Sequence, residues 1–170
     1  MSLKPNPASD TPSVILQQQQ DVAAADALIE RAFGPGRLTK VSERVRELAD
    51  FAPDLSFCAW REGRLAGVVR LWRVRVGDTR AVFLGPIAVE NDDRSGGVGG
   101  LLVAQACAAA KAAGENAIVL VGDAPYFSRF GFSAALAKDV RLPGPVDQNR
   151  VLAVAFKPEG ERLSGMIQAL

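Results

Sequence analysis

The stretch LGPIAVENDDRSGGVGGLLV, residues 84–103, decides the fold of this chain. It joins the end of an apolar strand to a glycine-rich loop and then to a helix. The adjacent Gly85 and Pro86 predict a bulge, because proline cannot donate to a strand ladder and glycine often marks an irregular strand. A strand that bulges here would part from its neighbour and open a slot in the sheet. The alternative is a simple defect in an edge strand.

The loop that follows is a predicted anion site. The glycines of GGVGG, residues 96–100, would leave backbone N–H groups uncovered by Cβ atoms, and the start of the next helix adds partial positive charge. Arg94 supplies a guanidinium group with bidentate reach. The chain has no GxxxxGK[ST] pattern, and a GxGxxG pattern starting at Gly97 fails at Leu102. Phosphate or pyrophosphate is therefore expected, but neither usual nucleotide motif is present.

Outward from this stretch, periodicity and turn residues predict alternating strands and helices. Strands are expected at 13–17, 56–61, 65–76, 80–89, 116–121 and 150–156, and helices at 22–33, 42–51, 97–113 and 124–130. Close turns join the second, third and fourth strands into an antiparallel meander. The fourth strand, the glycine-capped helix and the fifth strand then form a βαβ unit. The expected fold class is mixed α/β (α+β), with helices on both faces of a centrally splayed sheet.

Length and composition indicate one globular domain. The chain has 170 residues, 48% of them hydrophobic, which predicts a single domain at 13–170 after a disordered Pro- and Ser-rich tail at 1–12. A net charge of +1 gives no reason to expect nucleic acid or an anionic membrane as a partner. The start lacks a continuous apolar run, and no uninterrupted apolar stretch is long enough for a membrane span. A cytoplasmic location is the expectation.

The chain contains no histidine, which excludes a Ser-His-Asp triad, a Cys-His dyad and any zinc site that uses histidine. Its two cysteines, Cys58 and Cys107, are too few for a four-cysteine metal site. We expect both to be buried as small hydrophobic residues, and we expect no metal.

The sequence resembles the GNAT superfamily of N-acetyltransferases. Residues 94–99, RSGGVG, fit the acetyl-CoA motif R/Q-x-x-G-x-G/A of that family, which also lies between a bulged strand and a helix. Residues 122–132, GDAPYFSRFGF, are similar to the GDPxYYxRFGF motif of a bacterial branch. The resemblance covers roughly residues 13–156. It implies the acyl-CoA N-acyltransferase fold, with acetyl-CoA as cosubstrate and no metal.

The resemblance also implies how acetyl-CoA would bind. The splayed strand would pair its backbone with the pantetheine arm, as a missing strand would, and the loop amides would hold the pyrophosphate. A backbone N–H of residues 87–89 would polarise the thioester carbonyl. The residues expected to bind the cosubstrate are Ile87, Ala88, Val89, Arg94, Ser95, Gly96, Gly97, Val98, Gly99, Gly100 and Phe127.

Proton transfer is the step on which the sequence departs from the family. An amine with a pKa of about 10.4 costs roughly 4–5 kcal/mol to deprotonate at pH 7. Without histidine, a carboxylate or water must take the proton. Glu90, just past the bulged strand, is a candidate base, or else a solvated turn residue.

Many family members place a tyrosine, able to protonate the leaving thiolate, where this chain has Phe127. The adjacent Tyr126 either reaches the sulfur or serves the structure and the pocket wall. Our hypothesis is that no tyrosine acts as the acid.

The function implied is transfer of an acetyl group from acetyl-CoA to a primary amine of a small molecule or peptide, by direct attack in a ternary complex. The alternative is a non-catalytic acyl-CoA-binding module. The acceptor should enter near residues 33–41 and Arg70, where Arg37, Lys40 and Arg44 indicate an anionic group on the acceptor or simply a solvated helix face. The last segment, 158–170, adds either a strand or an oligomer contact, for which a homodimer is the expected form.

Overall fold

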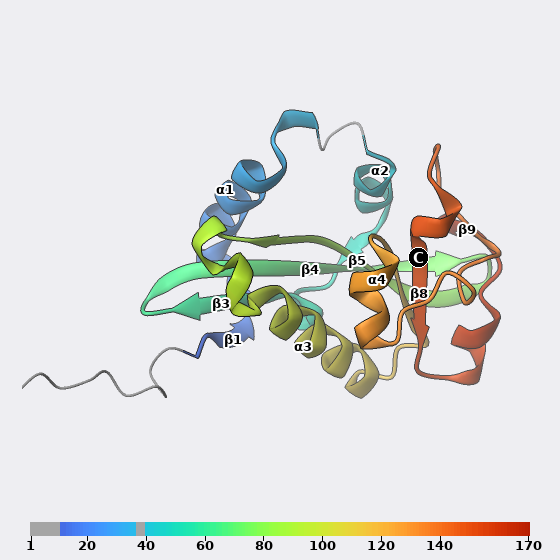
Figure 1. The fold of residues 1–170 in the computed structure, drawn as a ribbon. Helices are drawn as coiled ribbons and strands as arrows, with labels where there is room; N and C mark the ends of the chain where they lie inside the picture. Colours follow the sequence, from blue (N-terminus) through green and yellow to red (C-terminus); the bar gives the residue numbers. More distant parts are fainter. Residues whose placement is uncertain (1–10, 37–39) are drawn as a thin grey trace, which may run out of the picture.

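A computed structural model describes residues 11–36 and 40–170 (Figure 1). Most of the expected tail at 1–12, and Arg37, therefore lie outside the described residues. The strands are β1 (Ser13–Leu16), β2 (Asp50–Phe51), β3 (Phe57–Arg61), β4 (Arg64–Val76), β5 (Thr79–Val89), β6 (Ala117–Val121), β7 (Val140–Arg141), β8 (Val151–Ala155) and β9 (Gly165–Gln168). The α-helices are α1 (Val22–Phe33), α2 (Val41–Leu48), α3 (Val98–Ala112) and α4 (Ala124–Phe127). Short 3₁₀ turns include η5 (Asn91–Gly96), η6 (Ser128–Phe130) and η7 (Gln148–Arg150).

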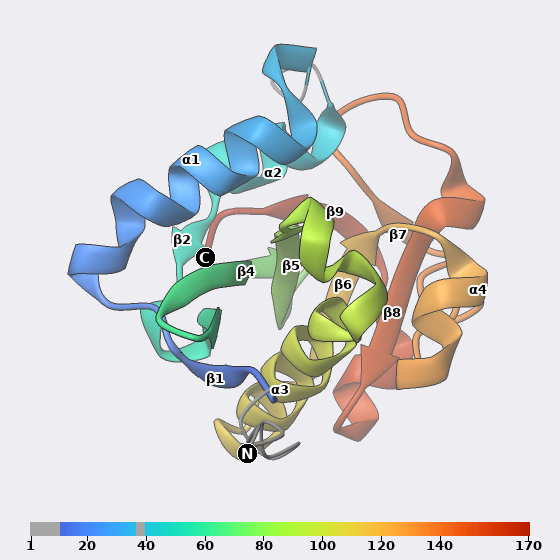
Figure 2. The same ribbon diagram turned by 60° about the vertical axis from the view of Figure 1, so that its left-hand side comes forward.

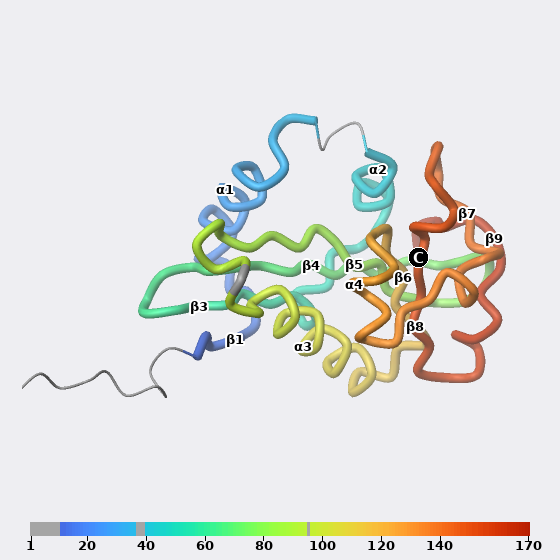
Figure 3. Tube along the Cα trace, viewed as in Figure 1, coloured from blue at the N-terminus to red at the C-terminus, as the bar shows by residue number. Residues whose placement is uncertain are grey.

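The main sheet runs in the order β1–β3–β4–β5–β6–β8. Antiparallel pairing of β3 with β4 and of β4 with β5 forms the expected meander, which passes between α1 and α3 in Figure 3. The strands β5 and β6 are parallel, as the βαβ unit through α3 requires. The predicted mixed sheet is confirmed.

Helices cover both faces of the sheet (Figure 2). On one face, α1 packs Leu28 and Ile29 against Val68 of β4. On the opposite face, α3 packs Leu102 against the sheet, in a core that also includes Phe127 of α4. A fully buried Leu or Ile side chain contributes about 1.5–3 kcal/mol to the burial term, so these two interfaces fix where the helices lie on the sheet.

The strands β5 and β6 stay paired only briefly. Their register covers Val82 with Ile118 and Phe83 with Val119, and no further pairs. Beyond Phe83, the edge of β5 that faces β6 therefore has no strand partner in the described part of the chain. The predicted central splay is present and begins at Leu84, the first residue of the Leu84–Val103 stretch.

At the edges of the fold, one prediction is wrong and one open alternative is decided. The helix expected at 42–51 ends at Leu48, and Phe51 instead lies in β2, where its ring is 5.1 Å from that of Trp72. The C-terminal segment adds a strand, because β9 pairs with both β4 and β7. The pairing of β9 and contact between aromatic rings are long-range interactions, which local periodicity cannot report.

Candidate active site

A bulge in β5 forms the slot. Gly85 and Pro86 together lie opposite the single residue Arg70, between the pairs Val69–Ile87 and Leu71–Leu84. The indole N–H of Trp72 donates a hydrogen bond to the Gly85 carbonyl oxygen at 2.6 Å. Gly85 has a φ of +147°, and a Cβ atom there would lie 3.1 Å from Arg46 Nη1. The backbone conformation therefore favours glycine here, and a larger residue would also require the Arg46 guanidinium group to shift slightly.

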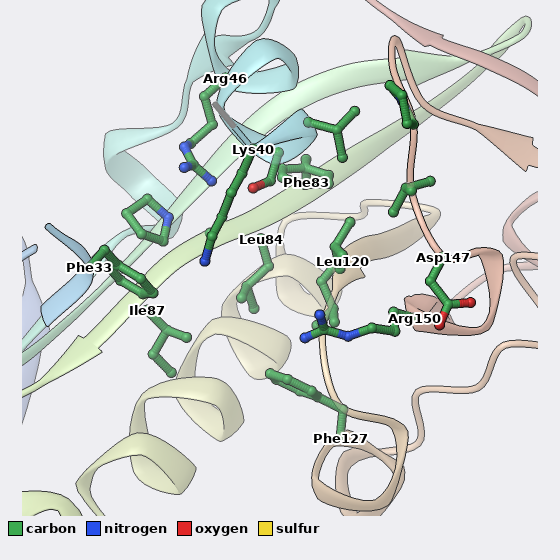
Figure 4. Close-up of a pocket in the computed structure, with 17 residues that line it drawn as sticks. Phe33, Lys40, Arg46, Phe83, Leu84, Ile87, Leu120, Phe127, Asp147 and Arg150 are labelled. Carbon is green, nitrogen blue, oxygen red and sulfur yellow. The ribbon is translucent and has the colours of Figure 1, made fainter. Parts of the chain in front are cut away.

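A cavity of about 450 Å³ opens at this bulge, between α2, β5, β6 and the segment before β8 (Figure 4). This volume suits a small molecule. Apolar side chains make up most of its wall, among them Phe33, Leu84, Ile87, Leu120 and Phe127. None of the loop residues 94–100 lines it.

The charged groups of this first cavity are mainly cationic. Lys40, Arg46 and Arg150 line it, against Asp147 as the single acidic residue in its described lining. Arg46 pairs with Glu43, and Asp147 accepts a hydrogen bond from the Asn149 backbone N–H at 3.0 Å. The first cavity therefore carries net positive charge.

A second cavity, of about 330 Å³, lies between α1 and α2 and shares Arg46 and Pro86 with the first. Its other lining residues are Asp26, Glu30, Glu43, Glu47, Arg70 and Trp72. Arg70 pairs with Asp26 at 2.7 Å, with its side chain only 13% exposed. Arg70, expected near the entry of the acceptor, is thus an ion-paired residue in the wall of the second cavity. The lining of the second cavity is therefore net negative, whereas the lining of the first is net positive.

The glycine-rich loop leads directly into α3. The turn η5 ends at Gly97, which has a φ of +75° and no atom within 4 Å of its Cβ position. No side chain among the described residues caps the N-terminus of α3. The first-turn amides of a helix have no partner inside the helix, so this loop is suited to hold an anion.

Beneath the loop lies a buried ion cluster that sequence reasoning missed. Asp93 is 1% exposed, and its two carboxylate oxygens accept hydrogen bonds from Arg61 at 2.7 Å and Arg64 at 2.9 Å. Hydrogen bonding to Asp93 raises the pKa of Arg64 above its usual range. Arg61 also lies 3.2 Å from the Cβ position of Gly96. The two arginines come from the β3–β4 hairpin, too far along the chain for a local motif to include them.

The predicted binding residues of β5 point in two directions. Ile87 lines the first cavity and Val89 packs on the α3 side, whereas Ala88 is buried against α1. Arg94 Nε contacts the Val89 carbonyl oxygen at 3.4 Å. The side chain of Val98 is fully buried, so only its backbone faces the loop, and Ser95 contributes its backbone to η5. Gly99 and Gly100 lie in the first turn of α3.

The two aromatic residues of α4 face different parts of the site. Phe127 lines the first cavity, with its ring pressed against Gly122. The Tyr126 hydroxyl lies 3.1 Å from the Cβ position of Gly99, at the start of α3. Tyr126 lines neither cavity. Its hydroxyl therefore lies beside the anion loop rather than in the slot.

Glu90, the candidate base, forms an ion pair with Arg31 of α1. Its side chain is 28% exposed and lines neither cavity. Asp147 is the carboxylate that does line the first cavity, and sequence reasoning did not identify it. Its only sequence signal was its place before a strand, in a Pro-Gly-Pro-rich segment.

The described residues contain neither a candidate metal site nor a candidate membrane-spanning helix. Residues 11–36 and 40–170 hold no cluster of three or more potential metal ligands of the His, Cys, Asp and Glu types. In the same residues, no helix is long and apolar enough to cross a membrane.

Comparison with known proteins gives concordant matches. Residues 23–132 match the model of the Acetyltransferase (GNAT) family. The chain is 32% identical over 128 residues to the uncharacterized N-acetyltransferase YhbS of Escherichia coli K12, covering 74% of this chain and 75% of that protein.

Solved structures agree with the sequence matches. The crystal structure of Escherichia coli YhbS in complex with CoA superposes with a TM-score of 0.78, at 22% identity, over 98% of this chain and 92% of that one. A GNAT family acetyltransferase from Brucella melitensis, solved with acetyl-CoA, superposes with a TM-score of 0.69, at 25% identity, over 92% and 94% of the two chains.

Proposed function

Because this chain belongs to the GNAT family of acetyltransferases, we propose that it transfers the acetyl group of acetyl-CoA to a primary amine by direct attack in a ternary complex. The protein is an acetyl-CoA-dependent N-acyltransferase. The acceptor is a small molecule or a peptide amine. One observation carries the proposal: β5 parts from β6 beside the uncapped, glycine-rich start of α3.

The described residues fit acetyl-CoA as cosubstrate. The amides of residues 95–100 would hold the pyrophosphate, with Arg94 as a nearby cation. The unpaired edge of β5 at Ile87–Val89 would pair with the pantetheine arm. Gly97, open on its Cβ side, allows a phosphate to approach the backbone closely. Asp93 would support this loop through Arg61, which lies beside Gly96.

Bound acetyl-CoA would supply the acetyl group as a thioester. The acceptor nitrogen forms a bond to the acetyl carbon, the carbon–sulfur bond breaks, and the amine loses one proton. A backbone N–H of residues 87–89 would polarise the carbonyl. The apolar wall at Leu84, Leu120 and Phe127 would exclude bulk water from the reacting atoms.

Water is the proposed carrier of the proton. Glu90 is engaged by Arg31, and Tyr126 lies over Gly99, so neither offers a group to the first cavity. Glu90 and Tyr126 stay candidate catalytic residues, and substitution of each residue tests that role. A water chain at the mouth of the cavity needs no titratable side chain in the slot.

The proposal extends to the domain, the oligomeric form and the cellular location of the protein. We treat residues 13–170 as one domain, which the strand order supports because β9 returns to pair with β4. A homodimer stays the expected oligomeric form. A bacterial cytoplasmic origin is supported by the bacterial source of both relatives.

The first experiment measures thermal unfolding with and without acetyl-CoA, using NADH and ATP as controls. A ligand that binds only the folded state raises the melting temperature, so acetyl-CoA alone should shift it by several degrees. Thiol release with a panel of amines then measures turnover. Binding without turnover on any amine would favour the alternative, a non-catalytic acyl-CoA-binding module. No shift at millimolar acetyl-CoA would contradict the proposal.

A further inference from the structure

Two cations extend into the first cavity, where Asp147 is the single acidic residue of the described lining. Lys40 precedes α2, and its ammonium group lies 5.5 Å from the centre of the Phe33 ring. Arg150 enters from η7, on the opposite side of the cavity (Figure 4). Neither has an ion-pair partner among residues 11–36 and 40–170, whereas Arg46 in the same wall pairs with Glu43. The cavity therefore holds two positive charges beside a largely apolar surface.

The position of Arg150 leaves its binding face open. Its Nε–H points to the Gly122 carbonyl oxygen at 3.4 Å. Its two terminal nitrogens are the pair that receives a carboxylate in bidentate fashion. In Figure 4 the guanidinium group extends between Leu120 and Phe127 into the cavity. An arginine held through Nε, with its fork directed at an apolar wall, is arranged to bind an anion.

The proposed cosubstrate does not account for these charges. Its phosphates would lie at residues 94–100, none of which lines this cavity. Its pantetheine arm and acetyl group, the parts that would reach the slot at Ile87, are uncharged. The two cations are therefore available to the other reactant. Asp147 offsets only part of their charge, and its carboxylate already accepts the Asn149 N–H.

Resting on the proposed function, we propose that the acceptor is a small primary amine that also carries a carboxylate, as an amino acid does. The carboxylate lies between Lys40 and Arg150, and the amine faces the bulge at Gly85–Pro86. A cavity of about 450 Å³ admits a molecule of this size. Charge-assisted hydrogen bonds in a concave, partly apolar site are stronger than at an open surface.

The step balances with the groups already named. The amine nitrogen bonds to the acetyl carbon, the sulfur leaves as the thiolate of CoA, and the proton lost by nitrogen passes to water. The two cations thus select the acceptor by its carboxylate.

The test uses acceptors that differ only in charge. Wild-type protein is assayed with ω-amino acids of increasing length and with the matching carboxamides, by release of CoA. We expect kcat/KM to favour at least one amino acid over its carboxamide by about tenfold or more. Arg150→Gln and Lys40→Gln should each raise KM for that amino acid about tenfold, leaving the carboxamide rate and the Kd of acetyl-CoA unchanged. Arg150→Lys should restore part of the loss, and Arg80→Gln, on the exposed β4–β5 hairpin, should change nothing.

Three outcomes would overturn the inference. A kcat/KM for the carboxamides equal to or above that for the amino acids would show that the cations do not bind a carboxylate. An equal loss of kcat/KM on both acceptor types in Arg150→Gln would show the same. A preference for succinyl-CoA over acetyl-CoA with neutral amines, abolished by Arg150→Gln, would assign the carboxylate to the acyl group instead.

A binding measurement separates this inference from the proposed function. The N-acetylated amino acid, added with CoA, should stabilise the wild type and not Arg150→Gln, even if no amine is turned over. In that case the anion site stands and the proposed acetyl transfer fails. If turnover occurs but neutral amines are preferred, the proposed function stands and the anion site fails.

Discussion

The ring of Phe127 presses against Gly122, so that a Cβ atom on the glycine would lie 2.5 Å from Phe127 Cε2. The same Cβ would lie 3.0 Å from Leu120 Cδ1, and both side chains line the first cavity. Gly122→Ala should therefore displace the cavity wall and lower the free energy of unfolding by about 1–3 kcal/mol, as overpacking does. Urea unfolding measures the stability, and thiol release measures the expected loss of turnover.

A matched control is Gly36→Ala, where no atom lies within 4 Å of the Cβ position. Its effect on stability should stay within about 0.5 kcal/mol, as at most surface sites. Equal stability and turnover in the two variants would contradict the close packing of Phe127.

Tyr126→Phe tests whether any tyrosine serves as the acid. The hydroxyl of Tyr126 lies at Gly99 and lines neither cavity, so turnover with saturating acetyl-CoA should be unchanged. Steady-state kinetics at saturating cosubstrate measure this. A fall of about 100-fold or more in kcat, with acetyl-CoA affinity intact, would instead identify Tyr126 as a general acid.

Phe127→Tyr adds a hydroxyl group to a ring that already lines the cavity. If proton delivery to the leaving sulfur limits the rate, kcat should rise, by about 100-fold or more if the added hydroxyl acts as a positioned acid. The control is Phe130→Tyr, on a ring of the same helical segment that lines neither cavity. An unchanged kcat in Phe127→Tyr would mean that proton delivery is not limiting.

Asp93→Asn should destabilise the proposed anion loop. The substitution removes the negative charge that pairs with Arg61 and Arg64, and breaking a buried ion pair lowers the free energy of unfolding by about 3–5 kcal/mol. The Kd of acetyl-CoA should rise about tenfold, measured by calorimetry at a temperature where the variant is folded. Asp92→Asn, at the exposed neighbouring position, should leave both quantities unchanged. Equal effects in the two variants would remove Asp93 from any role in supporting the loop.

The cysteines give a pH-dependent prediction. Cys58 is buried, as expected, whereas Cys107 is only partly buried. Loss of solvent contact raises the pKa of both thiols to about 11. At pH 8 only about 0.1% of such thiols are ionised, so the native protein should react slowly with a disulfide reagent, about tenfold faster per pH unit up to pH 10. Because the folded pKa is the higher one, the stability contributed by these thiols is complete below the unfolded pKa near 9 and is lost as pH rises toward 11. Fast labelling at pH 8 without denaturant would contradict this burial.

Local sequence signals predicted most of the fold. Alternating apolar and polar residues at 65–76 predicted β4, and the glycines that flank residues 97–113 predicted α3. Both predictions agree with the structure within one residue at each end. The bulge at Gly85–Pro86 could be predicted because proline and glycine limit what a strand can do locally. The two-residue strands β2 and β7 could not, since their pairing depends on partners far along the chain.

The candidate site likewise contains residues that local sequence could predict and residues that only long-range packing brings together. The proposed anion loop is contiguous, so its glycines and Arg94 could be proposed from the local sequence. The wall of the first cavity draws Lys40, Arg46 and Arg150 from separate elements, and only packing brings them together. The ion pair between Arg31 and Glu90 likewise joins residues 59 positions apart, which no local pattern reports.

The slot between β5 and β6 is shaped by backbone, through a bulge in the sheet core, whereas Lys40 and Arg150 reach it from connecting segments. In the mechanism and acceptor site proposed above, acyl transfer and acceptor choice are therefore carried by different parts of the chain. Connecting segments tolerate replacement far better than a buried sheet does. An engineer, or natural selection, could thus exchange the acceptor by rewriting the segments around residues 40 and 150 and leave the transfer apparatus intact.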